Sequence, residues 1–339
     1  MRVAVIGATG VVGETILRVL EERNVKVDTL LAYASRARDN AVTFRGQSLP
    51  VAKATTEQII ADRAQVALFA SSDDASAEMA LALADAGIVV IDNSSTFRLD
   101  PKCPLIIPEV NPHAIQSHHR IFPVGNCTAI VLVVALAPLE RAVGLRSVRT
   151  ATYQAVSGAG RAGLEALAAE EKGAAPDGTF AAPILHNVVP QVGSFSGFGD
   201  TGEEEKVVAE TRKTLNRPDL HVAAICVRVP VRTAHSEAVF FETERPTSVR
   251  ELSAALSKAP GVVFHDSGIV SPADVEGQDL VHVARLRAEQ SEGEQSEEEG
   301  RHFMMWVVGD QLRKGAATNG VQILELLIEQ GRFAPVAAS

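Results

Sequence analysis

The chain has 339 residues, of which 46% are hydrophobic and 22% charged, a balance that is ordinary for a globular protein large enough for two domains. Its net charge of −10 argues against a nucleic-acid-binding surface, and no apolar run is long enough to predict a membrane-spanning helix. We expect no signal peptide, because a predicted strand begins at residue 2. Three widely spaced cysteines favour a reducing cytoplasm over disulfides or a metal site.

The chain opens with an apolar strand at residues 2–6, a glycine-containing turn at 7–13, and an amphipathic helix over 14–23. Glycines let the backbone approach a pyrophosphate, and a helix N-terminus supplies N–H groups to it. The turn therefore predicts a dinucleotide site whose contacts would be Gly7, Thr9, Gly10, Val11 and Val12. The GxxGxxG spacing is looser than the usual fingerprint, so a tight turn without a ligand is the alternative.

The second strand is predicted over residues 27–33, and no acidic residue ends it. An NAD-selective site usually has a carboxylate there, on the ribose hydroxyl. This chain instead has Ser35, Arg36 and Arg38, which suit the 2′-phosphate of NADP. A solvated basic turn is the alternative interpretation.

Strand and helix continue to alternate through the first third of the chain. The pattern predicts a doubly wound parallel sheet, with a helix over 75–86 and strands at 66–70, 88–91, 105–107 and 121–124. A polar loop over 92–98 follows one of these strands. Loops after the carboxyl ends of parallel strands face the ligand crevice, so Arg98 is expected to hold an anion.

Cys127 follows the last of these strands and stands at the start of a buried helix predicted over 130–139. Unpaired N–H groups and the helix dipole at that position favour a thiolate. A thiolate can attack a carbonyl carbon, so Cys127 is a candidate nucleophile. A buried structural cysteine is the alternative.

Beyond about residue 142 the strands lengthen and the connections grow longer. The pattern predicts a second, α+β domain with a mostly antiparallel sheet and an acidic exposed loop at 289–299. The expected strands are 148–156, 222–229, 238–242 and 303–308; the expected helices are 164–171, 203–215 and a terminal helix at 315–330, with a long loop over 173–202. We expect domains over 1–126 and 127–314, with the terminal helix returning to the first.

Seven short motifs, in order along nearly the whole chain, resemble those of the aspartate-β-semialdehyde dehydrogenase family. They are Gly7-Ala8-Thr9-Gly10, Asp92-Asn93-Ser94-Ser95, Pro108-Glu109-Val110-Asn111, Gly125-Asn126-Cys127-Thr128, the run 152–160, Arg228-Val229-Pro230 with His235, and Leu312-Arg313-Lys314-Gly315-Ala316-Ala317. Each motif alone is weak, but the ordered set is specific. The fold implied is a Rossmann-like domain followed by a catalytic and dimerisation domain.

The resemblance implies a role for each candidate residue of the reaction centre. Cys127 would carry an acyl-enzyme thioester, with His235 as its acid/base partner. Gln154 would position the substrate, Arg228 would bind its carboxylate, and Glu203 would contact its amino group.

The resemblance also implies the sites for phosphate and for the cofactor. Arg98 and Lys206 would bind inorganic phosphate, with Asn93 close by, and Ser157 and Gly158 would lie against the nicotinamide of NADP. The implied enzyme is a cytoplasmic homodimer without a metal, an NADP-dependent phosphorylating aldehyde dehydrogenase. It would reduce aspartyl phosphate to the semialdehyde, reversibly, for diaminopimelate, lysine, threonine and methionine biosynthesis.

Two departures from the family pattern both concern cofactor contacts. The segment 35–38 is one residue shorter than usual, and Gln311 stands where an asparagine is usual before Leu312. From the sequence we expect neither change to touch the covalent chemistry. The strength of the preference for NADP over NAD is therefore left open.

Two rival interpretations come from related proteins. N-acetyl-glutamyl-phosphate reductase has a related fold and reaction, but typically shows Pro-Gly-Cys-Tyr where this chain has Gly125-Asn126-Cys127-Thr128. A catalytically silent relative would keep the fold alone. The joint presence of Cys127, Gln154, Arg228 and His235 argues against that second rival.

Overall fold

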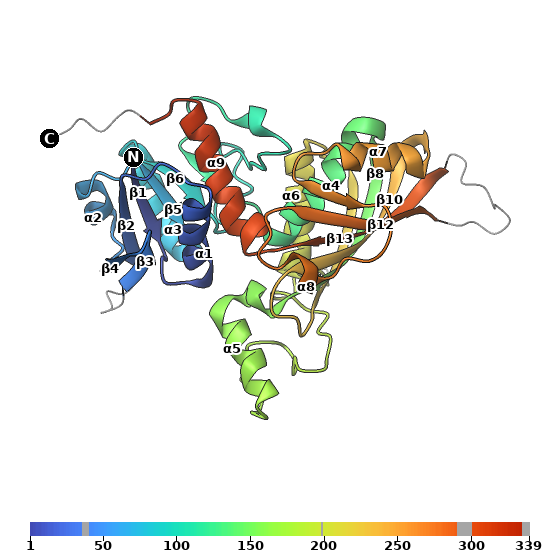
Figure 1. Ribbon diagram of the computed structural model, residues 1–339, viewed down its shortest axis with the longest axis horizontal. Coiled ribbons are helices and arrows are strands. Elements are labelled where there is room, and N and C mark those ends of the chain that lie inside the picture. The colour runs from blue at the N-terminus through green and yellow to red at the C-terminus, as the bar shows by residue number, and fades with distance from the viewer. Residues whose placement is uncertain (36–40, 198, 290–299, 334–339) are drawn as a thin grey trace. The chain divides into compact units, whose positions relative to one another are not determined.

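The computed structural model describes residues 1–35, 41–197, 199–289 and 300–333 (Figure 1). The chain forms two compact units. The first unit comprises Met1–Gly125 and Ala316–Ser339, and the second comprises Asn126–Gly315. Among the described residues, no helix combines the length and the apolar character needed to cross a membrane.

The first unit is built on a seven-stranded sheet with the order β3-β4-β2-β1-β5-β6-β7. All neighbouring strands are parallel except the β3–β4 pair. Because β1 pairs with β2 on one side and β5 on the other, the strand order reverses beside it, which is where doubly wound sheets bind ligands. The strands are β1 (Arg2–Ile6), β2 (Thr29–Ala34), β3 (Ala41–Phe44), β4 (Gln47–Lys53), β5 (Val66–Phe69), β6 (Val89–Asp92) and β7 (Ile121–Pro123).

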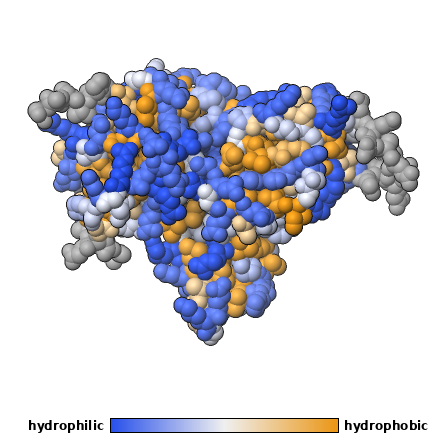
Figure 2. Space-filling model, in the orientation of Figure 1, coloured by the Kyte–Doolittle hydropathy of each residue, from blue (hydrophilic) through white to orange (hydrophobic). Residues whose placement is uncertain are grey.

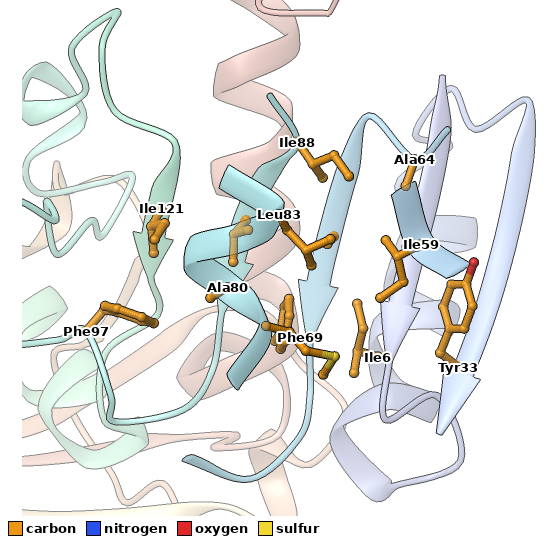
Figure 3. Packing of buried hydrophobic residues seen from close by; sticks show 14 of the residues in the cluster. Ile6, Tyr33, Ile59, Ala64, Phe69, Ala80, Leu83, Ile88, Phe97 and Ile121 are labelled. Atoms are coloured by element: carbon orange, nitrogen blue, oxygen red, sulfur yellow. The ribbon is translucent and has the colours of Figure 1, made fainter. Parts of the chain in front are cut away.

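Helices pack on this sheet and bury its central strands on both faces. Every residue of β5 and β6 is buried, as expected for parallel strands covered on two sides. Figure 3 shows Leu83 of α3 and Ile59 of α2 directed toward Phe69 and Ile6 of the sheet, and all four are buried members of one apolar cluster. The helices of this unit are α1 (Val11–Glu22), α2 (Thr56–Ala61), α3 (Asp73–Asp85), the 3-10 turn Pro112–Ala114 and α9 (Thr318–Glu329).

The predicted strand at residues 105–107 is absent, and that prediction was wrong. The residues are buried as expected, but side chains satisfy their backbone groups. Asn111 accepts from the N–H of Ile107 at 2.9 Å and donates to the carbonyl of Leu105 at 2.8 Å, while Asn319 of α9 donates to Ile106 at 2.9 Å. These three backbone groups are therefore not available to a neighbouring strand.

The C-terminal helix α9 belongs to the first unit, which confirms the predicted return. It begins at Thr318, later than predicted, because the turns at Arg313–Ala317 are π-helical. Besides Asn319, Glu325 fixes the helix by an ion pair of 2.7 Å with Arg23 at the end of α1. The hairpin β3–β4 and the short helix α2 were not predicted, because neither is long enough to show a clear period.

The second unit is built on a six-stranded sheet with the order β11-β12-β13-β10-β8-β9. Its middle pairs are antiparallel, as predicted, while the pairs β11–β12 and β8–β9 at the two edges are parallel. The strands are β8 (Leu145–Gln154), β9 (His221–Arg228), β10 (His235–Thr247), β11 (Val262–His265), β12 (Val281–Ala288) and β13 (Gly300–Gly309). Strands β11 and β12 were missed, and the predicted acidic loop falls almost wholly outside the described residues.

One face of this sheet is covered by helices, above all by the almost wholly buried α4. On β10, His235, Glu237 and Val239 point to that covered face and are buried. The helices of this unit are α4 (Cys127–Val143), the 3-10 turn Val156–Ala159, α5 (Gly160–Glu171), α6 (Gly202–Leu215), α7 (Val249–Ser257) and α8 (Pro272–Val275); α7 and α8 were not predicted.

The opposite face of the sheet, called here the open face, carries apolar side chains. Ile225 is 60% exposed, Phe240 40% and Tyr153 38%, and Tyr153 lies against Trp306 with 5.4 Å between ring centroids. The strand register puts all four residues on this face. Hydrophobic residues also reach the surface of the second unit on the side drawn in Figure 2.

Candidate active site

Cys127 is the first residue of α4 and is partly exposed. The preceding Asn126 caps the helix, because its Oδ1 accepts from the N–H groups of Thr128 at 3.0 Å and Ala129 at 3.1 Å. The Sγ of Cys127 lies 3.6 Å from Nε2 of His235. The capped helix start and the neighbouring imidazole both favour a thiolate at this sulfur.

His235 opens strand β10 and is fully buried. The backbone N–H of Ala155 donates to its Nδ1 at 3.1 Å, so a neutral ring carries its proton on Nε2, the atom that faces Cys127. Burial, and then the charge of Arg228, hold the pKa of His235 well below its ordinary value. The neutral imidazole is therefore a hydrogen-bond donor toward the sulfur.

Arg228 ends strand β9, and its buried guanidinium belongs to the same site. Its Nη1 donates to the carbonyl of Ala155 at 2.7 Å, and the described part of the chain offers it no second hydrogen bond. Burial lowers the pKa of Arg228, but an arginine starts so far above neutrality that it stays charged. Its remaining N–H groups can therefore meet an anionic ligand.

Two glycines allow these side chains to come together. A Cβ on Gly158 would lie 2.6 Å from Nη1 of Arg228 and 3.2 Å from Nε2 of His235. A Cβ on Gly315 would lie 2.9 Å from the Cβ of Cys127. Contacts below 3 Å do not occur between real Cβ atoms and their neighbours, so both positions need glycine in this arrangement.

A buried polar network connects the cysteine helix to the sheet. Oε1 of Glu203 accepts from Asn126 at 2.9 Å and from Nε2 of Gln154 at 3.0 Å. Gln154 in turn accepts from the hydroxyl of Thr152 at 3.1 Å. Within the described residues, the second oxygen of Glu203 makes no hydrogen bond. It can therefore accept one from a ligand.

The structure thus brings together the sequence-predicted residues Cys127, Gln154, Glu203, Arg228 and His235 within the second unit. Lys206 lies further along α6, half-buried, and no carboxylate of the described residues pairs with it. Ser157 is buried, and its hydroxyl accepts from Gln311 at 2.5 Å.

The glycine turn lies in the first unit, between β1 and α1. Gly7 has a φ of +84°, and a Cβ there would lie 2.2 Å from the carbonyl oxygen of Ala70. Gly10 is the N-cap of α1 and, as a glycine, has no side chain with which to cap the helix. These features fit an anionic pyrophosphate. Ser35 is exposed at the end of β2, while Arg36 and Arg38 lie outside the described residues.

The polar loop 92–98 is organised by its own side chains. Asp92 is fully buried and accepts from Ser76 at 2.5 Å and from Ser94. Arg98 donates to the carbonyls of Val124 at 2.8 Å and Asn93 at 2.7 Å. Arg98 and Asn93 belong to the first unit and Lys206 to the second, so the predicted phosphate site stays a prediction.

Sequence reasoning missed the role of Asn126 and of the two glycines. An asparagine directly before a helix is a strong N-cap signal, so its capping role could have been found. Its second role, as the partner of Glu203, depends on residues 77 positions apart and has no local signal.

Comparison with known proteins agrees with this architecture. The family model "Semialdehyde dehydrogenase, NAD binding domain" matches residues 2–118, and "Semialdehyde dehydrogenase, dimerisation domain" matches residues 136–314. The fold and the site define an oxidoreductase with a nicotinamide-cofactor-binding domain, of the semialdehyde dehydrogenase class.

Individual relatives indicate which family within this class the chain belongs to. Aspartate-semialdehyde dehydrogenase of Aquifex aeolicus is 42% identical over 97% of this chain and 98% of its own length, and that of Bacillus subtilis is 38% identical over 96% and 97%. The crystal structure of aspartate semialdehyde dehydrogenase II from Vibrio cholerae, complexed with ASA, is 40% identical with a TM-score of 0.90, covering 97% of this chain and 98% of that one. The chain belongs to the aspartate-semialdehyde dehydrogenase family.

One buried carboxyl near the site predicts how stability depends on pH. Glu237 lies two residues after His235 on the same face of β10. Its Oε2 is 3.5 Å from the hydroxyl of Thr150, and its Oε1 has no hydrogen-bond partner among the residues that the structure describes. Burial raises the pKa of Glu237 well above its ordinary value. The folded protein therefore keeps this proton above about pH 4.3, where the unfolded chain loses it, and stability falls as pH rises toward the raised pKa.

We expect Glu237→Gln to remove this contribution, because glutamine keeps the shape and does not titrate. Urea unfolding at about pH 6 and about pH 9 should show a smaller loss of stability on going to alkaline pH than in the wild type. Glu165→Gln, on an exposed position of α5, is the control and should keep the wild-type slope. An unchanged slope in Glu237→Gln would show that this carboxyl is ionised in the folded protein.

Proposed function

We propose that this protein catalyses the reversible, NADP-dependent conversion of aspartate 4-semialdehyde and phosphate to aspartyl phosphate. In the biosynthetic direction it would reduce aspartyl phosphate, on the route to lysine, threonine and methionine. The observation that carries the proposal is the 3.6 Å approach of the Cys127 sulfur to a histidine nitrogen that bears its proton. The activity of the relatives gives the substrate.

The first step is addition of the Cys127 thiolate to the aldehyde carbon. A C–S bond forms, the carbonyl π pair moves to oxygen, and the resulting oxyanion needs a donor. The Nε2–H group of His235 can donate a hydrogen bond to this oxyanion without transferring its proton. The proton is on Nε2 because Nδ1 accepts from the N–H of Ala155. This geometry supports the donor half of the acid/base role predicted for His235.

Phosphate completes the reaction. A nicotinamide cofactor bound beside Ser157 and Gly158 would supply the hydride acceptor for semialdehyde oxidation and the hydride donor for reduction. The Cys127 thioester is then attacked at its carbonyl carbon by a phosphate oxygen, and the thiolate leaves. Arg98, Asn93 and Lys206 are the proposed phosphate ligands, and the absence of an ion pair at Lys206 within the described residues supports its part in this.

The substrate is held at its other end by opposite charges. Arg228 has N–H groups left over after its bond to Ala155, and these can bind the carboxylate. Glu203 has one carboxylate oxygen left over, which can accept from the ammonium group. Gln154 donates to Glu203 and so fixes the position of that carboxylate. The positive charge of Arg228 and the carboxylate of Glu203 thus complement the carboxylate and the ammonium group of an amino acid.

We propose that the nicotinamide cofactor is NADP. The pyrophosphate would meet the backbone of Gly7, Thr9, Gly10, Val11 and Val12, the 2′-phosphate would meet Ser35, Arg36 and Arg38, and the nicotinamide would lie against Ser157 and Gly158. The structural support is the glycine at the N-cap of α1, which lets a ligand approach the helix start, and the absence of a carboxylate at the end of β2.

We also propose a homodimer. The second unit matches a dimerisation domain, and its open face leaves Ile225, Phe240 and Tyr153 partly exposed in the isolated chain. A second copy would cover such apolar side chains. We propose a cytoplasmic location as well, since no disulfide joins Cys103, Cys127 and Cys226 in the described part of the chain.

The function is tested by phosphate-dependent reduction of NADP with aspartate semialdehyde, and with N-acetyl-glutamate semialdehyde as the rival substrate. Cys127→Ser should fall below about a hundredth of wild-type turnover, because a neutral alcohol is a weak nucleophile. Its circular dichroism and cofactor affinity should be unchanged. Turnover only with the N-acetylated substrate would favour the rival enzyme, and no turnover with either would favour a catalytically silent relative.

The carboxylate clamp is tested by Arg228→Lys. Lysine keeps the charge but loses the planar pair of donors, so kcat/KM for aspartate semialdehyde should fall by roughly tenfold or more. An aldehyde of the same length without the carboxylate should lose far less. Equal losses for the two aldehydes would mean that Arg228 does not bind the carboxylate.

The cofactor proposal is tested by titrating the purified protein with NADP and with NAD. NADP should bind more tightly, and Arg36→Ala should weaken it by about ten- to a hundredfold, the value of one charged hydrogen-bonded contact. NAD binding should hardly change in that variant. Equal affinity for both cofactors in the wild type would contradict the proposal.

A further inference from the structure

The buried side chain of Gln311 joins the two segments that hold His235. Gln311 follows strand β13 and is almost completely buried. Its Oε1 accepts from the backbone N–H of Ala234 at 2.7 Å, and its Nε2 donates to the hydroxyl of Ser157 at 2.5 Å. The amide oxygen and the amide nitrogen of Gln311 therefore both form hydrogen bonds within the protein.

The first of these partners directly precedes His235. Ala234 is fully buried and has a φ of +69°, a left-handed conformation that is unfavourable for a residue with a Cβ. Such a conformation persists where the surroundings hold it. The oxygen of Gln311 holds the N–H of this residue, and so fixes the direction in which β10 begins.

The second partner lies in the segment that contacts the ring of His235. Two residues before Ser157, the N–H of Ala155 donates to Nδ1 of His235 and the carbonyl of Ala155 accepts from Arg228. This segment is already joined to the residues before Ala234, since the N–H of Val156 donates to Val231 at 2.8 Å. Gln311 adds a second connection between the two segments, since it bonds both Ser157 and Ala234.

We propose that Gln311 is a positioning residue, which keeps Nε2 of His235 directed at the sulfur of Cys127 by holding the N–H of Ala234. The link through Ser157 is secondary, because the backbone already ties the segment 155–158 in place. The inference deepens the proposed function, since it concerns the donor to the reacting sulfur. Its test needs no turnover.

The test is the rate at which Cys127 is alkylated by iodoacetamide in the full-length protein, measured against pH by mass spectrometry of the Cys127 peptide. Only the thiolate reacts, so the midpoint of the profile reports how well the thiolate is stabilised. Cys103 and Cys226 are buried, and their peptides are quantified separately. A role in packing alone would leave this midpoint where it is.

Gln311→Met keeps a similar volume but loses both hydrogen bonds. Its midpoint should move up by about one pH unit, the size expected when a thiolate loses part of a charge-assisted hydrogen bond. Ser157→Ala removes the second link alone and should stay close to the wild type. Gln322→Ala, which removes a hydrogen bond to Glu109 in the first unit, is the matched control and should not move the midpoint.

An unchanged midpoint in folded Gln311→Met, or an equal shift in Ser157→Ala, would overturn the proposal. If Gln311→Met does not fold, Gln311→Leu takes its place, because leucine also lacks both the oxygen that accepts from Ala234 and the N–H that donates to Ser157. The same upward shift is expected, and no shift would again refute the role. A shift in a protein without dehydrogenase activity would reject the proposed function and leave the positioning role standing.

Discussion

The reaction centre depends on a single asparagine side chain with two duties. Asn126 caps the helix that begins at Cys127, and the same amide donates to Glu203, which is bonded to Gln154 at the end of β8. Its own N–H is held by Glu210 of α6. The start of α4 is therefore fixed to a helix and to a strand at once, and the direction of the cysteine side chain follows from that attachment.

Buried charge is managed in this unit by backbone amides. Glu204 accepts from the N–H groups of Cys226 and Thr201, and Glu210 accepts from the N–H of Asn126. These hydrogen bonds offset the desolvation free energy of burying the carboxylates. Arg228 and His235 differ from these carboxylates, because one is a buried cation and the other a buried neutral ring. The guanidinium keeps its charge, and its field is one reason why the imidazole beside it stays neutral.

Much of this arrangement could be predicted from local sequence, and the rest depends on long-range contacts. The glycine turn and the helix at Cys127 have local signals, because strand, glycine and helix follow each other within a few residues. The strand predicted at 105–107 failed because Asn319, more than two hundred positions away, binds its backbone. The protonated nitrogen of His235 and the two partners of Gln311 are likewise set by residues far along the chain, where no spacing rule applies.

The contribution of α9 to the first unit has a consequence for how the chain is made. The carbonyl of Ile106 and the side chain of Arg23 have partners in Asn319 and Glu325, which are synthesised 213 and 302 residues later. Ribosomes add about 5–20 residues per second, so the nascent first unit waits roughly ten to forty seconds for its closing helix. Meanwhile the second unit, continuous from Asn126 to Gly315, emerges whole. The cysteine-bearing unit can thus fold first, and the nucleotide-binding unit is completed only when α9 has left the ribosome.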